Sequence, residues 1–261
     1  GCWKIHLPFF DFRKDGLYMI VKHIPIEVTS KQVGKPVVGD PADLTAYILE
    51  PVEGITDKKR PAVLLCPGGG YRKLSGREDQ PVAMKYLAAG FHVFVLHYSL
   101  VPDVFPRALM ELALSMKLIR EHGNEWNVDV KRIAVSGFSA GGHLACCLGV
   151  FWDKEWLYGA LDVKPDMIRP DGMILCYPVI TSGEYCHRGS FECLMGEDAA
   201  YKDEKLRRLL SLEYQVGSQV PKTFLWHTWT DQSVPVENSL ALLQALRKAG
   251  VNAEAHLYPV G

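Results

Sequence analysis

A serine between two glycines is the residue of this chain best suited to covalent chemistry. Ser139 is the centre of a Gly-Phe-Ser-Ala-Gly run at residues 137–141, which follows an apolar, β-branched segment and precedes a helix-compatible one. At such a strand-to-helix turn the serine backbone is strained and its hydroxyl is exposed, and larger flanking side chains would collide with the neighbouring strand and helix. The start of the helix also offers backbone N–H groups to an anion. We therefore predict that Ser139 is a nucleophile.

A glycine-rich loop predicts where a negatively charged oxygen would be bound. The apolar residues 61–66 indicate a buried strand, and this strand ends in Pro-Gly-Gly-Gly-Tyr. Glycines let the backbone turn sharply and bring its N–H groups close to a substrate oxygen. Phosphate binding is disfavoured because no Gly-Lys-Ser/Thr follows the loop. We expect the N–H groups of Gly68 or Gly69, together with that of Ala140, to form an oxyanion hole.

An acidic residue should orient the base that activates the serine. In a triad of the order Ser, Asp/Glu, His, the acid follows a later strand. Asp231 comes shortly after the strand-like residues 222–227 and is the predicted acid. An aspartate in a loop before a helix is also a common N-cap, which is the alternative role for this residue.

The histidine of the triad is the residue that this sequence does not supply. It should follow the last strand, which is expected at residues 253–258, and the chain ends shortly afterwards. His256 lies inside that strand in the solvent-facing phase, so it is only a weak fallback. His227 precedes Asp231, which is the wrong order, and His143 follows the serine motif, where a structural role is expected. We expect the general base to lie outside these 261 residues.

Alternating strands and helices must position these residues. Residues 18–28 and 44–50 indicate an antiparallel hairpin. Later strands are expected at residues 62–66, 91–97, 132–136, 172–177, 222–227 and 253–258, and helices at 78–89, 107–122, 141–150 and 236–249. The nearly continuous apolar strands predict an α/β fold, in which a mostly parallel sheet has helices on both faces. Residues 1–261 are expected to form a single domain, with a small cap insertion at about 181–220.

Composition disfavours several classes of partner. The chain has 29 basic and 30 acidic residues and a formal charge of −1, so no electrostatic case exists for nucleic acid or an anionic membrane. No apolar run approaches the roughly 18 residues of a membrane span. The seven cysteines lack zinc-type spacing and indicate buried thiols, which favours a cytoplasmic, reducing location and no metal. Secretion stays open because the chain starts at Gly1 rather than Met. A homo-oligomer stays open too.

Taken together, these motifs resemble the α/β-hydrolase superfamily, and more closely its bacterial acetylesterase branch, which contains acetyl-xylan-esterase-like enzymes. The matching runs are Cys-Pro-Gly-Gly-Gly-Tyr at 66–71, Ser-Gly-Arg-Glu-Asp-Gln-Pro at 75–81, Phe-Val-Leu-His-Tyr-Ser at 94–99, Gly-Phe-Ser-Ala-Gly-Gly-His-Leu-Ala at 137–145, Cys-Tyr-Pro-Val-Ile at 176–180 and Asp-Gln-Ser-Val-Pro at 231–235. The resemblance extends from about residue 45 to the end. It implies that the last strand continues into a turn bearing the catalytic histidine and then into a final helix, both absent here. Pro67 stands where the His-Gly-Gly-Gly lipase relatives have histidine.

The resemblance implies a serine carboxylesterase that hydrolyses short acyl esters, above all acetyl groups on sugars. Such an enzyme works through a Ser-Asp-His triad and an acyl-enzyme, and it implies no metal or organic cofactor. The insertion at 181–220 mixes charged with apolar residues. A polar cap suits an acetyl ester better than a long acyl chain, because that chain would leave buried polar groups unpaired.

Other classes of protein share some of these features. A serine peptidase of the same fold would use the same triad, and Glu184, Glu192 and Glu197 in the insertion could then bind a peptide amine. A hydrolase-fold binding protein without catalysis would fit the absent histidine, although such proteins usually also lose the nucleophile or the oxyanion glycines. The serine motif itself disfavours a simple carbohydrate-binding module.

Overall fold

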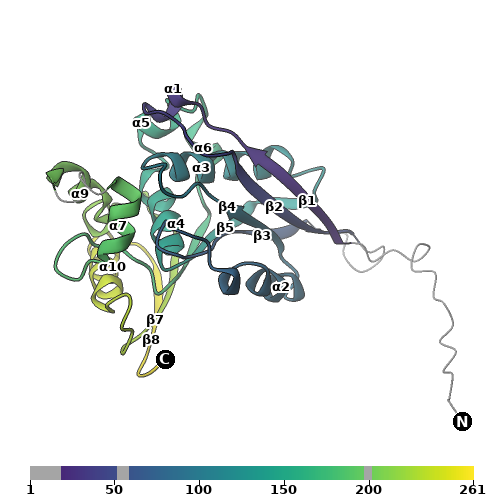
Figure 1. Ribbon diagram of the computed structural model, residues 1–261. Helices are drawn as coiled ribbons and strands as arrows, with labels where there is room; N and C mark the ends of the chain where they lie inside the picture. The colour runs from purple at the N-terminus through teal and green to yellow at the C-terminus, as the bar shows by residue number, and fades with distance from the viewer. Residues whose placement is uncertain (1–18, 52–58, 197–201) are drawn as a thin grey trace, which may run out of the picture.

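The computed structural model describes residues 19–51, 59–196 and 202–261, and it contains one eight-stranded sheet (Figure 1). The strands are β1 (Met19–Ile26), β2 (Ala42–Leu49), β3 (Arg60–Cys66), β4 (His92–His97), β5 (Val128–Phe138), β6 (Gly172–Cys176), β7 (Thr223–Thr228) and β8 (Ala253–Tyr258). Their order across the sheet is β1-β2-β4-β3-β5-β6-β7-β8. β2 runs antiparallel to both of its neighbours, and all other pairs are parallel. The predicted hairpin and the predicted parallel sheet are both confirmed.

The strands alternate with helices, as the sequence predicts. The helices are α1 (Ser30–Val33), α2 (Gln80–Ala88), α3 (Arg107–Glu121), α4 (Ala140–Phe151), α5 (Glu155–Tyr158), α6 (Pro165–Ile168), α7 (Arg188–Met195), α9 (Glu204–Leu210) and α10 (Glu237–Lys248), with 3₁₀ turns η1 (Gly76–Glu78) and η2 (Leu212–Tyr214). Among the described helices, none is long and apolar enough to span a membrane. This arrangement is the α/β-hydrolase fold.

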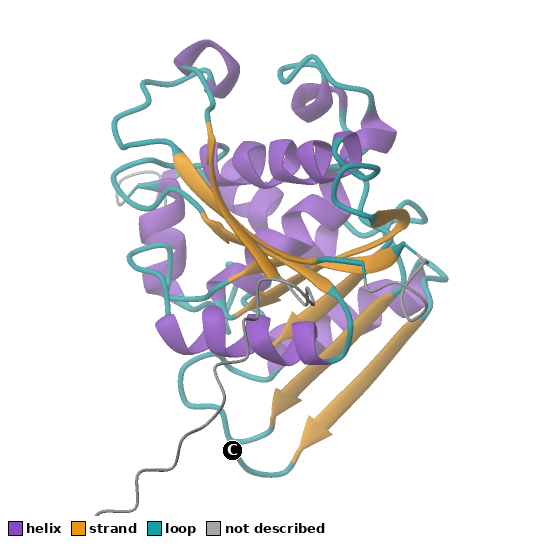
Figure 2. Ribbon diagram, turned by 90° about the vertical axis from the view of Figure 1, so that its right-hand side faces the viewer, coloured by secondary structure: helices purple, strands orange, loops and turns teal. Residues whose placement is uncertain are grey.

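The two faces of the sheet are covered unequally. Helices α3, α4 and α10 pack on one face and form the larger core with strand residues such as Leu64 and Leu225. On the other face α2 packs over β2 and β4, where neighbouring strand residues such as Leu65 form a smaller core. Adjacent strand residues point to opposite faces, so the strands from β2 to β7 contribute side chains to both cores. Figure 2 shows the helices on both sides of the twisted sheet.

Helices lie on both faces of the sheet, as expected, but they do not cover the whole of the α2 face. On the α2 face, the described helices leave the β7 and β8 end of the sheet open, where Trp226 is half-buried and His256 is exposed. Strand β8 is exposed at every residue except Leu257, which is half-buried.

The insertion between β6 and β7 is anchored at several points. Its described elements are α7, α9 and η2, and η2 contacts both α4 and α10. The ring of Phe191 in α7 lies 5.4 Å from the imidazole of His143 in α4. The side-chain oxygen of Asn238 in α10 accepts hydrogen bonds from the N–H groups of Ile180 and Thr181, at 2.8 and 3.0 Å. The insertion is therefore fixed against the core at its start and at α7.

Candidate active site

Ser139 occupies a strained turn at the carboxyl end of a central strand. It separates β5 from α4 and has φ +52° and ψ −119°, a backbone conformation that L residues rarely adopt. Its N–H donates to the carbonyl of Cys176 in β6, at 3.0 Å. Its own carbonyl accepts from the N–H groups of His143 and Val179, both at 3.1 Å. The neighbouring strand and the following helix thus hold the turn in place, and the Ser139 side chain is only half-buried.

The glycines on either side of Ser139 are required by close backbone contacts. A Cβ atom on Gly137 would lie 2.1 Å from the carbonyl oxygen of Gly141. A Cβ atom on Gly141 would lie 2.2 Å from the carbonyl oxygen of Cys66 and 2.4 Å from that of Pro67. Real Cβ atoms do not come so close, so these glycines let α4 begin directly against the end of β3.

The glycine loop after β3 lies against this turn. A Cβ atom on Gly68 would sit 3.1 Å from the Cβ of Ser139. Gly69 has φ +129°, which side chains disfavour. The hydroxyl of Tyr98 donates to the carbonyl of Pro67 at 2.7 Å, and that of Tyr71 bonds to Nδ1 of His143 at 2.9 Å. The loop is therefore held at both ends.

One of the predicted oxyanion donors is already occupied. The N–H of Gly68 donates to Oε2 of Glu78 at 2.8 Å, so it is not free for a substrate oxygen. Of the two donors predicted in this loop, the Gly69 N–H is therefore the one that remains available to a substrate oxygen. Ala140 is the first residue of α4, so its N–H has no acceptor within that helix. Glu78 belongs to a run noted in the sequence, but nothing in that run indicated which atom its carboxylate would bind.

A cavity of about 500 Å³ brings the predicted residues together. It is lined by Gly69, Ser139 and Asp231, among others. Polar and charged side chains make up most of the remaining wall, including those of Lys73, Ser75, Arg77, Glu78 and Tyr177. None of the described residues of the insertion at 181–220 is among the lining residues, so its role as a cap stays a prediction.

Asp231 is held by the loop that it begins. Its Oδ1 accepts hydrogen bonds from the N–H groups of Ser233 and Val234, at 2.8 and 2.9 Å. Its Oδ2 lies 3.4 Å from Nε2 of His227. The carboxylate therefore has a fixed orientation at the wall of the cavity. Its part in catalysis stays a prediction.

Two buried histidines lie near the site, and both are fully engaged. His227 bonds through Nε2 to the carbonyl of Val234 at 2.9 Å and through Nδ1 to the hydroxyl of Ser239 at 2.7 Å. A carbonyl only accepts, so Nε2 carries the proton and Nδ1 accepts from the serine. Burial lowers the pKa of His227, which keeps its imidazole neutral. His227 is thus a structural residue.

His143 is engaged in the same way. Its Nε2 donates to the carbonyl of Leu210 at 2.9 Å, so Nδ1 accepts from the hydroxyl of Tyr71. Complete burial lowers the pKa of His143 to about 4. The expected structural role of this residue agrees with these contacts.

The fallback histidine does not reach the serine. His256 is exposed on β8, and its Nε2 bonds to Oε1 of Glu254 at 2.8 Å. It is not among the residues that line the cavity with Ser139. Within the described ranges, no histidine lines that cavity.

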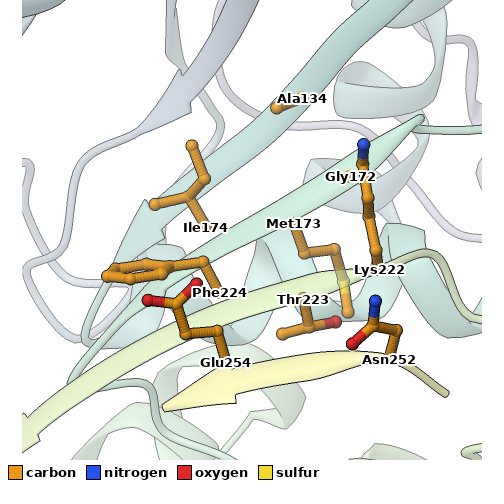
Figure 3. Close-up of a pocket in the computed structure, with 9 residues that line it drawn as sticks. All are labelled: Ala134, Gly172, Met173, Ile174, Lys222, Thr223, Phe224, Asn252 and Glu254. Carbon is orange, nitrogen blue, oxygen red and sulfur yellow. The ribbon is translucent and has the colours of Figure 1, made fainter. Parts of the chain in front are cut away.

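A second hollow lies at the other end of the strands. It has a volume of about 320 Å³, and its lining includes Gly172 and Thr223, the first residues of β6 and β7 (Figure 3). Lys222, Phe224 and Glu254 also line it. In parallel α/β sheets the reacting groups gather at the carboxyl ends of the strands, where Ser139 lies. The candidate active site is therefore the first cavity.

A strained serine after a central parallel strand, facing a glycine loop, defines an α/β-hydrolase. The family model BD-FAE matches residues 51–246, and the chain belongs to this family. The chain is 36% identical over 213 residues to endo-1,4-beta-xylanase B of Butyrivibrio fibrisolvens, a match that covers 78% of this chain and 32% of the relative. It is 29% identical over 204 residues to an acetylxylan esterase of Xylanibacter ruminicola, covering 77% of this chain and 40% of the relative. The chain thus spans less than half the length of these curated relatives.

Solved structures that resemble this chain have the same α/β-hydrolase fold. An acetyl ester-xyloside bifunctional hydrolase from Caldicellulosiruptor lactoaceticus superposes with a TM-score of 0.79 at 36% identity, covering 92% of this chain and 86% of that one. A carboxylesterase from Lactobacillus plantarum superposes with a TM-score of 0.76 at 30% identity, covering 93% and 84%. These similarities confirm the resemblance drawn from the motifs, since both structures carry the names of ester hydrolases and share this fold.

Proposed function

We propose that this protein hydrolyses short acyl esters, foremost acetyl esters of sugars, through an acyl-enzyme on Ser139. The observation that carries the proposal is the meeting of Ser139, Gly69 and Asp231 at one cavity. The names of two relatives, an acetylxylan esterase and an acetyl ester-xyloside hydrolase, support the choice of acetylated sugars.

The geometry suggests a role for each group. Ser139 attacks the ester carbonyl while a histidine oriented by Asp231 takes its proton. The N–H groups of Gly69 and Ala140 stabilise the negative oxygen, each by about 3 kcal/mol in comparable sites. The alcohol leaves with the proton from the histidine, and water then hydrolyses the acyl-enzyme. His143 and His227 are both engaged elsewhere, so we place this histidine outside the described residues.

The cavity favours a small acyl group. Its wall is mostly polar, with Leu74 and Val234 as the larger apolar contributions. A long acyl chain would have to be buried against Lys73 and Arg77, whose charged groups would lose water without gaining partners. An acetyl group covers little of this wall, and a hydrated sugar can hydrogen-bond to the rest.

The peptidase alternative gains no support from the described residues. Glu184 is exposed in the insertion and Glu192 lies in α7, and neither lines the cavity. Glu197 falls outside the described residues. Neither of these two described glutamates of the insertion therefore places a carboxylate beside Ser139 for a peptide amine.

The decisive experiment uses the full encoded protein and p-nitrophenyl esters of two, four and eight carbons. We expect kcat/KM to be highest for the acetate and Ser139→Ala to lower kcat by about 10³-fold or more. Ser218→Ala, at an exposed loop position, is the matched control and should leave the rate unchanged. A maximum at eight carbons would refute the short-acyl preference. Activity retained in Ser139→Ala would refute the nucleophile, and rapid cleavage of aminoacyl anilides with poor acetate turnover would favour the peptidase.

A further inference from the structure

Glu78 joins two loops that lie on opposite sides of Ser139. Its Oε2 accepts from the N–H of Gly68 at 2.8 Å, and its Oε1 accepts from the hydroxyl of Tyr177 at 2.9 Å. Gly68 follows β3 and Tyr177 follows β6, and these two strands flank β5. The carboxylate therefore bridges the end of the strand that carries Ser139.

The backbone on both sides of this bridge is unusual. Tyr177 has φ +37°, a left-handed conformation that costs a non-glycine residue energy. Gly69 has φ +129°, so the loop could relax to other conformations if it were released. A Cβ atom on Gly68 would lie 2.6 Å from Oε2 of Glu78, which shows how closely the carboxylate is set against the loop.

The other backbone groups of Gly68 and Gly69 are also engaged, with one exception. The carbonyl of Gly68 accepts from the N–H of Ser75 at 2.8 Å, and the carbonyl of Gly69 accepts from Arg72 and Lys73, both at 3.2 Å. The N–H of Gly69 has no acceptor among the described residues. The Gly69 N–H shares a peptide plane with the Gly68 carbonyl, so its direction is set by Ser75 within that plane and by Glu78 at the Gly68 N–H one peptide earlier.

We propose that Glu78 is a positioning residue for the ester hydrolysis proposed above. It acts through its two hydrogen bonds, which hold the Gly69 N–H toward the oxygen of the reacting ester and keep Tyr177 at the opposite wall of the cavity. Its negative charge would oppose the charge that develops on that oxygen. The contribution of Glu78 to catalysis therefore comes from its hydrogen bonds, and a neutral side chain of the same shape should be able to replace Glu78.

Two variants separate the hydrogen bonds from the charge. In Glu78→Gln the amide oxygen can accept from Gly68 while the amide NH₂ donates to the Tyr177 oxygen, so both bonds survive without the charge. Glu78→Ala removes both bonds. Asp79→Asn is the matched control, because Asp79 is the neighbouring carboxylate but bonds to His97 at 2.6 Å instead.

On p-nitrophenyl acetate, Glu78→Ala should lower kcat of the full encoded protein by about 10²-fold with KM nearly unchanged, as when an oxyanion donor is lost. The kcat of Glu78→Gln should stay within about five-fold of the wild-type value. The kcat of Asp79→Asn should equal the wild-type value. A raised KM at unchanged kcat would overturn the proposal in favour of direct substrate contact. If Glu78→Gln and Glu78→Ala lost the same kcat, the effect would come from the charge of Glu78, and this result would also overturn the proposal.

A second measurement keeps this inference separate from the proposed function. The exchange rate of the Gly68 amide proton, followed by NMR, should be slow in the wild type and in Glu78→Gln and fast in Glu78→Ala. If the wild type cleaves no ester, the proposed function fails, and the exchange rates still decide whether Glu78 holds the loop. Unchanged exchange in Glu78→Ala, or unchanged kcat in an active enzyme, would refute the role of Glu78 alone.

Discussion

Burial of the His143 imidazole makes the free energy of unfolding depend on pH. The pKa of His143 is about 4 in the folded chain, against an ordinary value of 6.5. Between these values the unfolded chain binds a proton that the folded chain does not, so acidification favours unfolding. From pH 7 to pH 5 this residue should cost the folded state about 2 kcal/mol. Urea unfolding at the two pH values measures the difference.

Two variants isolate the contribution of this histidine. His143→Gln should lower the free energy of unfolding at pH 7 but weaken its decrease toward pH 5. Tyr71→Phe removes the hydrogen bond to Nδ1 while the imidazole stays buried, so it should keep the wild-type pH dependence. If His143→Gln lost as much stability on acidification as the wild type, His143 would not be the titrating group.

The sequence predicts single residues well where local spacing decides their place. Ser139 could be located because its motif, strand and helix are contiguous. The choice between the Gly68 and Gly69 N–H groups could not be made, because it depends on a carboxylate ten residues further on. The contact between Glu78 and Tyr177, 99 residues apart, arises only when β3, β5 and β6 align in the sheet.

The strand–turn–helix around Ser139 leaves no room for a methyl group at Gly141. A Cβ atom there would meet backbone oxygens at 2.2 and 2.4 Å, and neither β3 nor the loop after it can move freely. Gly141→Ala should therefore lower the free energy of unfolding by at least about 2 kcal/mol, as measured by urea denaturation. Gly189→Ala in α7 is the control, because a Cβ atom there meets nothing within 4 Å. Equal stability of the two variants would contradict the packing argument.

A buried amide in α10 hydrogen-bonds to the start of the insertion. Asn238 accepts from two backbone N–H groups, and its Nδ2 donates to the carbonyls of Tyr185 and Pro235, at 2.8 and 3.0 Å. Asn238→Ala should cost about 2–4 kcal/mol of unfolding free energy, because buried backbone groups lose their partners. Gln244→Ala, at an exposed position of the same helix, should have little effect. Thermal and urea unfolding of both variants would test this, and similar losses would show that the amide is not the anchor.

Element boundaries deviate from the sequence where side chains or long-range pairing intervene. The predicted strand 132–136 extends over Val128–Phe138, because Gly137 and Phe138 pair with β3 and β6 although glycine usually marks a turn. The predicted helix 78–89 begins at Gln80, after the 3₁₀ turn that ends at Glu78. Pairing across the sheet therefore overrides the local preference of Gly137.

At the scale of the whole molecule, the sheet and the helices on both of its faces were predictable, but the exposure of β8 was not. The apolar strands predicted a buried parallel sheet, and the order of strands and helices predicted the α/β class. The pattern of β8 left Ala253 and Ala255 in the phase expected to face the core, yet both are exposed. Small apolar side chains do not reveal whether a helix will cover them, because that depends on neighbours far away in the sequence.

The exposed position of β8 has a consequence for handling the protein. Among the described strands, β8 pairs with β7 alone, so its other side presents unpaired backbone groups that can recruit a strand from a second molecule. We expect the chain to associate edge to edge as its concentration rises, and Ala255→Lys to oppose this, because a charge on an edge strand discourages pairing. Light scattering over a dilution series should show an average mass that rises with concentration in the wild type and rises less in Ala255→Lys. Association that Ala255→Lys leaves unchanged would place the contact elsewhere.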